Sequence, residues 1–224
     1  MYNNIFADAT TAFEVLYEKI MQDGFVTEVG TKSIKNVCII LKNPLDNEIT
    51  TEWRKWKKSY AEREWNWYLA ANPSVEEIKK FAPIWDKMHN GDNIVNSNYG
   101  FQWMRNDQLN KCIEQLKADN NTRQAWVTIY DGKEKEKYEY DTPCTISIGF
   151  SIRAHKKLDM SVIMRSNDLI YGFCNDQFCF SNLQKLVADR LNIEVGTYFH
   201  YAHDMHIYEK HFDLKTKFYD KNEN

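Results

Sequence analysis

The sequence predicts one α/β domain that spans residues 1–224. A composition of 43% hydrophobic and 27% charged residues is typical of a globular chain, and the length is sufficient for one good-sized core. Helical patterns prevail before residue 123, where the texture changes to β-branched runs with period-two alternation. No repeat, low-complexity tract or linker interrupts the chain, so we expect a single domain.

The elements follow from periodicity and from local stop signals. Residues 10–24 have apolar side chains at helical spacing, with a capping box formed by Thr11 and Glu14 and a stop at Gly24. Further helices are expected within 50–74, where the helix ends before Pro73, and at 106–120 and 178–191. Strands are expected at 34–43, 125–131, 144–153, 158–168 and 196–212.

Charge and composition exclude several classes of protein. The net charge is -3 and no block of Lys and Arg occurs, so we expect no direct nucleic-acid binding. No apolar run approaches the ~20 residues of a membrane helix, and the N-terminus does not resemble a signal peptide. The five cysteines include no pair with zinc-type spacing, so we expect free thiols and no metal site. A cytoplasmic location is expected, in the host if the chain is phage-encoded.

Several polar residues are candidates for chemistry, although each has a structural alternative. Cys144 follows Pro143 at the start of a strand, where it is either a nucleophile or a small buried side chain. Arg123 and Arg165 are either phosphate ligands or partners in surface ion pairs. Glu64 lies among tryptophans, so its pKa is expected to be raised unless it faces solvent.

His206 and Tyr208 alternate along a strand, so both should point to one face. A sugar hydroxyl would fit between them, and the alternative is that neighbouring backbone satisfies them. None of these residues is decisive alone.

Seven separated motifs together resemble the thymidylate synthase family. In chain order they are EREWNWYL, IWDKM, SNYGFQW, TRQAWV, TPCTI, RSNDLIYGF and HDMHIY, and they extend from about Glu64 to Phe212. Their agreement in order makes the resemblance specific. The resemblance implies a mixed β-sheet flanked by helices, and a homodimer formed through that sheet.

The resemblance also implies roles for individual residues. Cys144 is the implied nucleophile, and Glu64 is the implied proton-transfer group. The phosphate is held by Arg165, Ser166 and Arg123, the last from the second subunit. The residues that contact the nucleotide are Tyr99, Asn167, Asp168, Gly172, His206 and Tyr208. Folate is bordered by Trp85, Asp168 and Gly172, and no metal is implied.

Three departures from the family pattern are informative. Thr145 follows the nucleophile where the synthases have His, and Gln124 replaces a second Arg, which leaves Arg123 as the better phosphate ligand. Asp176 replaces the asparagine that faces the pyrimidine. Cys-Thr and a final Asp are features of the phage deoxycytidylate hydroxymethylases in this family, so the resemblance is closest to that group.

Asp176 argues for a cytosine base. One asparagine amide complements the N3–H donor and O4 acceptor of uracil, whereas cytosine presents the opposite pair. An unpaired buried polar group costs ~1–3 kcal/mol, and a carboxylate accepts from the cytosine N4 amino group. A proton shared with N3 would complete the contact and stabilise the charge that develops there. The alternative is that Asp176 only caps a helix that starts near Phe178.

The implied activity is transfer of a one-carbon unit from 5,10-methylenetetrahydrofolate to C5 of dCMP. The Cys144 thiolate adds to C6, and addition of water gives 5-hydroxymethyl-dCMP and tetrahydrofolate. Four alternatives stay open: a thymidylate synthase acting on dUMP, a CMP hydroxymethylase, a reductive dCMP methylase, and a non-catalytic nucleotide-binding relative. The retained Cys144 and Glu64 count against the last, because a binding module needs no nucleophile.

Overall fold

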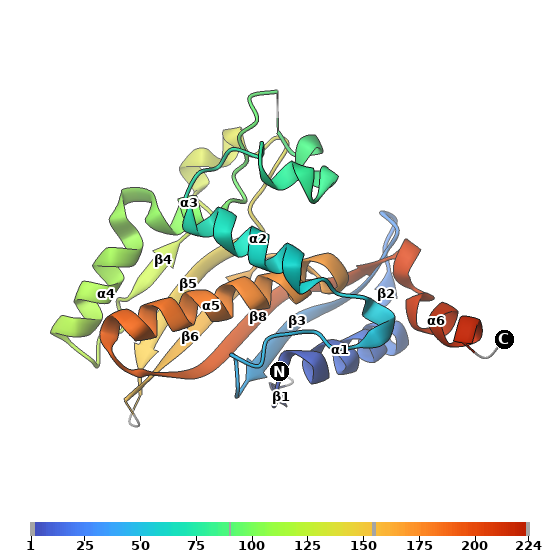
Figure 1. Cartoon of the computed structure of the whole chain (residues 1–224), viewed down its shortest axis with the longest axis horizontal. Helices are drawn as coiled ribbons and strands as arrows, with labels where there is room; N and C mark the ends of the chain where they lie inside the picture. The colour runs from blue at the N-terminus through green and yellow to red at the C-terminus, as the bar shows by residue number, and fades with distance from the viewer. Residues whose placement is uncertain (1–2, 90, 154–155, 223–224) are drawn as a thin grey trace.

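The computed structural model describes residues 3–89, 91–153 and 156–222, which form a mixed β-sheet with helices packed on it (Figure 1). The helices are α1 (Ala9–Asp23), α2 (Lys58–Leu69), α3 (Tyr99–Met104), α4 (Gln108–Ala118), α5 (Cys174–Leu191) and α6 (Leu214–Asn222). The strands are β1 (Asn3–Phe6), β2 (Phe25–Val26), β3 (Thr31–Leu41), β4 (Trp126–Thr128), β5 (Thr145–Ile152), β6 (Lys157–Met164), β7 (Asn167–Asp168) and β8 (Glu194–Tyr208). The predicted α/β class is confirmed.

The sheet is built around β8. The strand order is β1-β3-β8-β6-β5-β4, while β2 pairs with β3 and β7 pairs with β8. β8 is antiparallel to β3 and parallel to β6, and the short β7 continues the β6 side of the sheet along the end of β8. This arrangement brings the segment after β6 next to His206, although the two are 40 residues apart in sequence.

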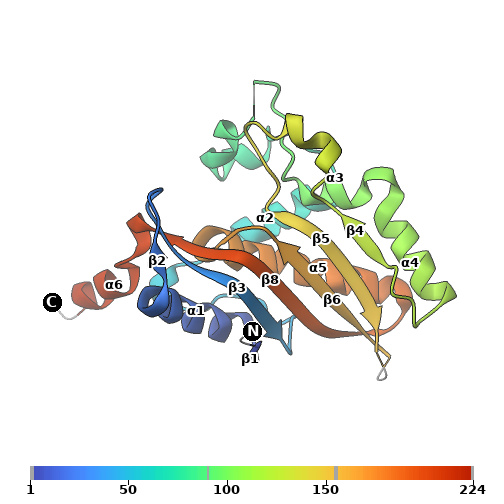
Figure 2. The same cartoon turned by 180° about the vertical axis from the view of Figure 1, so that it is seen from behind.

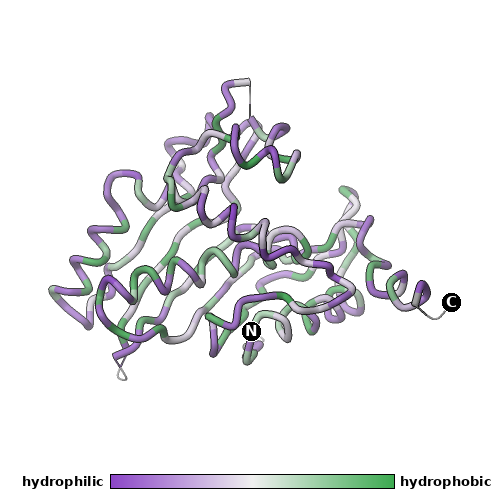
Figure 3. Tube along the Cα trace, viewed as in Figure 1, coloured by the Kyte–Doolittle hydropathy of each residue, from purple (hydrophilic) through white to green (hydrophobic). Residues whose placement is uncertain are grey.

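The two faces of the sheet differ. Helices α1, α2 and α5 lie on one face, whereas no helix of the described residues crosses the face that Figure 2 presents. Alternation along the strands places half-buried Cys38, Ile40, Ile163, Phe199 and Tyr201 on this open face. Figure 3 shows apolar residues recurring along the strands and α5, and hydrophilic residues on the outer turns of α4.

Helix α1 anchors the sheet through Phe13, Leu16 and Ile20, which are fully buried. Burying each such side chain contributes about 1.5–3 kcal/mol. The predicted capping box is wrong: Asp8 is the N-cap, and its carboxylate accepts from the Thr11 backbone N–H at 2.7 Å. The predicted stop at Gly24 is confirmed.

Helix α2 is shorter than the predicted helix over 50–74. A 3₁₀ turn at Glu52–Arg54 precedes it, and Lys55 adopts a left-handed conformation with φ of 50° that separates the turn from the helix. At the other end, Ala71 has φ of 49° and stops the helix before Pro73. Helix-forming composition therefore overestimated the length, because backbone turns at both ends override it.

Helix α5 begins earlier than the predicted start near Phe178. A single π-helical turn at Leu169–Phe173 leads directly into Cys174. Asp168 caps this turn, since its carboxylate accepts from the Ile170 backbone N–H at 2.8 Å. Asp176 therefore lies inside the first turn and is not the N-cap, so the predicted alternative of a helix cap is wrong.

None of the described helices is long and apolar enough to cross a membrane. The predicted free cysteines are confirmed, and Cys112, Cys174 and Cys179 are buried.

Gly100 lets α3 cross α2 at close range, because a Cβ there would overlap the carbonyl group of Tyr68. We expect Gly100→Ala to destabilise the fold by roughly 3 kcal/mol and to lower Tm by about 6–12 °C, since the clash is with backbone. Gly132→Ala is the matched control, because nothing lies within 4 Å of its Cβ position. Calorimetry of both variants checks this, and equal Tm values would contradict it.

Candidate functional site

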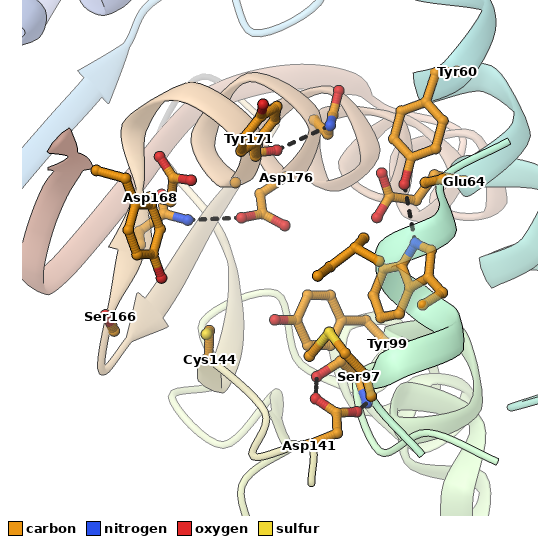
Figure 4. Close-up of a pocket in the computed structure, with 18 of the residues that line it drawn as sticks. Tyr60, Glu64, Ser97, Tyr99, Asp141, Cys144, Ser166, Asp168, Tyr171 and Asp176 are labelled. Carbon is orange, nitrogen blue, oxygen red and sulfur yellow. Dashed lines mark hydrogen bonds between the residues drawn. The ribbon is translucent and has the colours of Figure 1, made fainter. Parts of the chain in front are cut away.

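A cavity of about 1080 Å³ lies between α2, the loop before β5 and the segment that joins β6 to α5. All predicted site residues except Arg123 line it, although they come from distant parts of the chain (Figure 4). They are Glu64, Trp85, Tyr99, Cys144, Arg165, Ser166, Asn167, Asp168, Gly172, Asp176, His206 and Tyr208.

Cys144 is held at the start of β5 beside a cation. The Arg165 guanidinium donates to the carbonyls of Pro143 at 3.0 Å and Thr142 at 2.8 Å, and lies 3.8 Å from Cys144 Sγ. Burial raises the pKa of Cys144 to about 11, although Arg165 opposes the shift. With this pKa the thiol is protonated at neutral pH, and added positive charge nearby would favour the thiolate.

Ser166, His206 and Tyr208 lie together at one side of the cavity. Ser166 Oγ is 3.5 Å from His206 Nδ1, and the His206 and Tyr208 rings meet edge to face at 5.3 Å. The predicted common face of His206 and Tyr208 is confirmed. With Arg165, this group offers hydroxyl, imidazole and guanidinium groups of the kind that bind a phosphosugar.

Asp176 faces the cavity from the first turn of α5 (Figure 4). Asn167 Nδ2 donates to its Oδ2 at 2.7 Å. Burial is the main cause that raises the pKa of Asp176 to about 6, and the nearby Asp168 adds to it. A Cβ on Gly172 would lie 2.7 Å from Asn167 Nδ2 and 3.2 Å from Asp176 Oδ2, so the glycine lets these two side chains meet.

Glu64 enters from the opposite wall, on the buried side of α2. Its Oε1 accepts from the Tyr68 hydroxyl at 3.1 Å, while its Oε2 is buried without a hydrogen-bond partner among the described residues. Burial, helped by the charge of Asp176, raises the pKa of Glu64 to about 8. The predicted raised pKa is confirmed. A carboxyl group titrating in this range is suited to proton transfer near neutral pH.

Trp85 lines the cavity with only a small part of its side chain. It is only 9% exposed, and its indole N–H donates to the Tyr60 hydroxyl at 3.0 Å. Phe81 and Ile84 from the same segment are 47% and 58% exposed and present a larger apolar surface. A planar ligand would thus meet Phe81 and Ile84 as well as the tryptophan edge.

Sequence reasoning missed residues that support the predicted set. Asp141 is buried three residues before Cys144 and accepts from the backbone N–H and the hydroxyl of Ser97, at 2.6 and 2.5 Å. Its position before Pro-Cys was the only signal in the sequence. Arg54 donates twice to the Ile170 carbonyl, at 3.1 and 2.6 Å, and supports the π turn.

Arg123 lies outside the cavity of its own chain. It is exposed in the loop between α4 and β4, where it borders a separate depression with Asp119, Thr122 and Gln124. A direct role in the same chain's phosphate site is therefore excluded by position.

We expect alkylation of Cys144 by iodoacetamide in the nucleotide-free protein to be slow at pH 7. Between about pH 6.5 and 9.5 its rate should rise roughly tenfold per unit, because the thiolate fraction grows until pH reaches the pKa of about 11. Peptide mass spectrometry separates this site from half-buried Cys38. Arg165→Gln should slow alkylation further, and a plateau below about pH 8 would refute the assignment.

The family model described as "Thymidylate synthase" matches residues 11–223. A deoxyuridylate hydroxymethyltransferase of Bacillus phage SP01 is 28% identical over 234 residues, which cover 96% of this chain and 61% of that protein. A thymidylate synthase of Bacillus atrophaeus is 28% identical over 174 residues, covering 74% of this chain and 76% of the relative.

The fold agrees with these sequence similarities. The thermostable thymidylate synthase A from Bacillus subtilis superposes with a TM-score of 0.74 at 22% identity, covering 93% of this chain and 82% of that structure. The predicted mixed sheet flanked by helices is thus confirmed, and so is the similarity to phage hydroxymethylases. The chain spans 61% of the length of its phage relative. With the family model matched across nearly the whole chain, the protein belongs to the thymidylate synthase family.

Proposed function

We propose that the protein is a deoxycytidylate 5-hydroxymethyltransferase, which converts dCMP to 5-hydroxymethyl-dCMP. The observation that carries the choice of base is Asp176, whose carboxylate faces the same cavity as Cys144. It accepts from the exocyclic amino group of cytosine, whereas it would face the O4 acceptor of uracil with like charge. Its raised pKa, of about 6, makes a proton shared with cytosine N3 accessible near neutral pH.

The covalent step belongs to Cys144. Its thiolate adds to C6 of the pyrimidine, and C5 becomes an enamine carbon that attacks an electrophile. The Arg165 guanidinium at 3.8 Å favours the thiolate and opposes the effect of burial on the pKa of Cys144. Tyr99, buried beside the thiol, shapes the pocket that holds the ring.

Proton transfer belongs to Glu64. With its pKa near 8 it holds a proton at neutral pH and exchanges it with a reacting group or water. Because Oε1 accepts from Tyr68, the proton belongs on the unpaired Oε2, and such a buried polar atom favours an ordered water in the cavity. In the proposed reaction this water is delivered to the exocyclic methylene and yields the hydroxymethyl group.

Enzymes of the thymidylate synthase family transfer one-carbon units and use methylenetetrahydrofolate as co-substrate. The residues present fit that molecule, since Phe81, Ile84 and Trp85 offer an apolar wall for a planar ring. Arg54, Lys55 and Lys57 border the same cavity and suit an anionic glutamate tail. When bound, methylenetetrahydrofolate supplies the one-carbon unit beside Asp168 and Gly172.

The phosphate lies, in this proposal, on Arg165 and Ser166, and the sugar hydroxyl on His206 and Tyr208. Arg123 reaches the site from the second subunit of a homodimer formed through the open face of the sheet. Two observations support this: Arg123 is exposed outside its own cavity, and the open face carries Phe199, Tyr201 and Ile40. Exposed Trp126, whose ring covers Gly149, extends this apolar surface.

Hydroxymethylation of dUMP is a second candidate, because the similar phage SP01 protein is a deoxyuridylate hydroxymethyltransferase. Hydroxymethylation of dUMP uses the same covalent step, and the two substrates differ only in the edge of the base that faces residue 176. Reduction of the transferred carbon to a methyl group is a further reaction that is compatible with the same site.

Tritium release from C5-tritiated nucleotides tests the proposal. With methylenetetrahydrofolate present, we expect release from dCMP in preference to dUMP and CMP, together with tetrahydrofolate and 5-hydroxymethyl-dCMP. Cys144→Ser should abolish release and leave dCMP binding largely intact, because only the nucleophile is lost. Cys112→Ser is the matched control, since that thiol is buried on α4 outside the cavity. Release from dUMP alone would refute the base, and dihydrofolate formation would refute the hydroxymethyl product.

Mixing two inactive variants tests the position of Arg123. Arg123→Ala and Cys144→Ser subunits should each be inactive alone, while a random mixture should recover about a quarter of wild-type activity. Half of the dimers would then be mixed, and each mixed dimer has one complete site. Activity assays after subunit exchange measure this, and the absence of recovery in a verified mixed dimer would show that Arg123 does not act across the interface.

A further inference from the structure

A chain of buried polar groups runs from the middle of β8 to Asp176. The Tyr198 hydroxyl lies 2.8 Å from His200 Nδ1, and His200 Nε2 lies 3.0 Å from Asn167 Oδ1. Asn167 Nδ2 then donates to Asp176 Oδ2 at 2.7 Å. Tyr198 and His200 are fully buried and lie outside the cavity lining, so they cannot touch a bound nucleotide directly.

Hydrogen-bond chemistry gives this chain one direction. Among the described residues, His200 Nδ1 is the only polar partner of the Tyr198 hydroxyl. An unpaired buried donor is costly, so the hydroxyl donates to Nδ1. Burial lowers the pKa of His200 to about 3, so the ring is neutral and carries its single proton on Nε2. Nε2 therefore donates to Asn167 Oδ1, which turns the amide nitrogen of Asn167 towards Asp176.

The direction matters because an ionised carboxylate only accepts, whereas an amide or a protonated carboxylic acid both donates and accepts, and the neighbouring group determines which of the two faces the base. A free asparagine at position 176 complements uracil in one orientation and cytosine in the other, after a half-turn of its amide. Discrimination between the bases thus requires a neighbour that prevents the half-turn. Asn167 Nδ2 requires an acceptor at the Oδ2 position of residue 176, and that requirement selects one orientation.

We propose that Tyr198, His200 and Asn167 form a positioning relay that orients the polar group of residue 176 and thereby sets the choice between an amino and a carbonyl group at C4 of the pyrimidine. This inference rests on the proposed function, in which residue 176 reads the base. Tyr198 and His200 are positioning residues, since they act through Asn167. Gly172 completes the arrangement, because a Cβ there would push Asn167 away from Asp176.

The test compares nucleotide binding in the Cys144→Ser background, where no turnover occurs, and the kcat/KM ratio for dCMP over dUMP in the active protein. His200→Leu removes both hydrogen bonds, and we expect the ratio to move about tenfold towards one. His200→Gln keeps an acceptor for Tyr198 and a donor for Asn167, and should restore the ratio to within about threefold of wild type. Tyr198→Phe removes only the terminal donor and should have a smaller effect in the same direction.

A structural control separates positioning from destabilisation. Gln184 on α5 is buried and donates to the Leu158 and Thr197 carbonyls, so Gln184→Leu also removes buried hydrogen bonds, but outside the relay. It should lower Tm without changing the dCMP to dUMP ratio. If His200→Leu fails to fold, Tyr198→Phe, which loses a single hydroxyl, decides the question. An unchanged ratio in a folded relay variant would overturn the proposal.

The double variant sharpens the result. With the relay intact, Asp176→Asn has its carbonyl held by Asn167 and its NH₂ directed at the base, which should favour the O4 acceptor of dUMP. Asp176→Asn combined with His200→Leu should lose that preference, since the amide is free to turn. A wild-type protein that prefers dUMP would refute the proposed substrate alone. The relay is tested by the kcat/KM ratio for dCMP over dUMP. Whichever nucleotide the wild-type protein prefers, replacement of His200 should move this ratio towards one.

Discussion

The hydrogen bond between Asn167 and Asp176 is the contact on which the rest of the site depends. It joins the end of the sheet, at β7, to the first turn of α5 across a single π-helical turn. The close approach is possible because Gly172 has no side chain in the gap. As a result, eight residues of this segment line one cavity, although an ordinary strand would send alternate side chains to opposite faces: Arg165, Ser166, Asn167, Asp168, Tyr171, Gly172, Asn175 and Asp176.

Burial of ionisable groups gives this cavity its chemical character. Glu64, Asp176 and Cys144 all have raised pKa values, and burial is the first cause in each case. The cavity therefore holds three groups whose ionisation is disfavoured, and Arg165 is the cation beside Cys144. Such an arrangement opposes stability, and a core of fully buried apolar residues on α1 and α5 offsets it. In the proposed reaction these raised pKa values keep protons available at the place where an enamine and a hydroxymethyl group must form.

Local sequence predicted most elements correctly and erred at their ends. The apolar spacing of α4 and the β-branched runs of β5 and β6 were sufficient to predict these elements, because each packs on one face along its whole length. The predicted starts of α2 and α5 were wrong. A left-handed Lys55 determines where α2 begins, and a π-helical turn determines where α5 begins. The motif residues lining the cavity were predicted by resemblance, whereas Asp141, Arg54 and His200 had no comparable signal.

By itself the sequence determined the identities of the candidate groups: a cysteine after a proline, a glutamate among tryptophans, and an aspartate at the end of RSNDLIYGFCND. Only the tertiary structure decided which groups meet. His200 and Asn167 are 33 residues apart and bond because β7 pairs with β8, and Arg123 is excluded from its own cavity because its loop lies beyond α4. Such contacts depend on strand pairing and backbone turns, which are set by packing across the whole chain and leave little trace in local residue patterns.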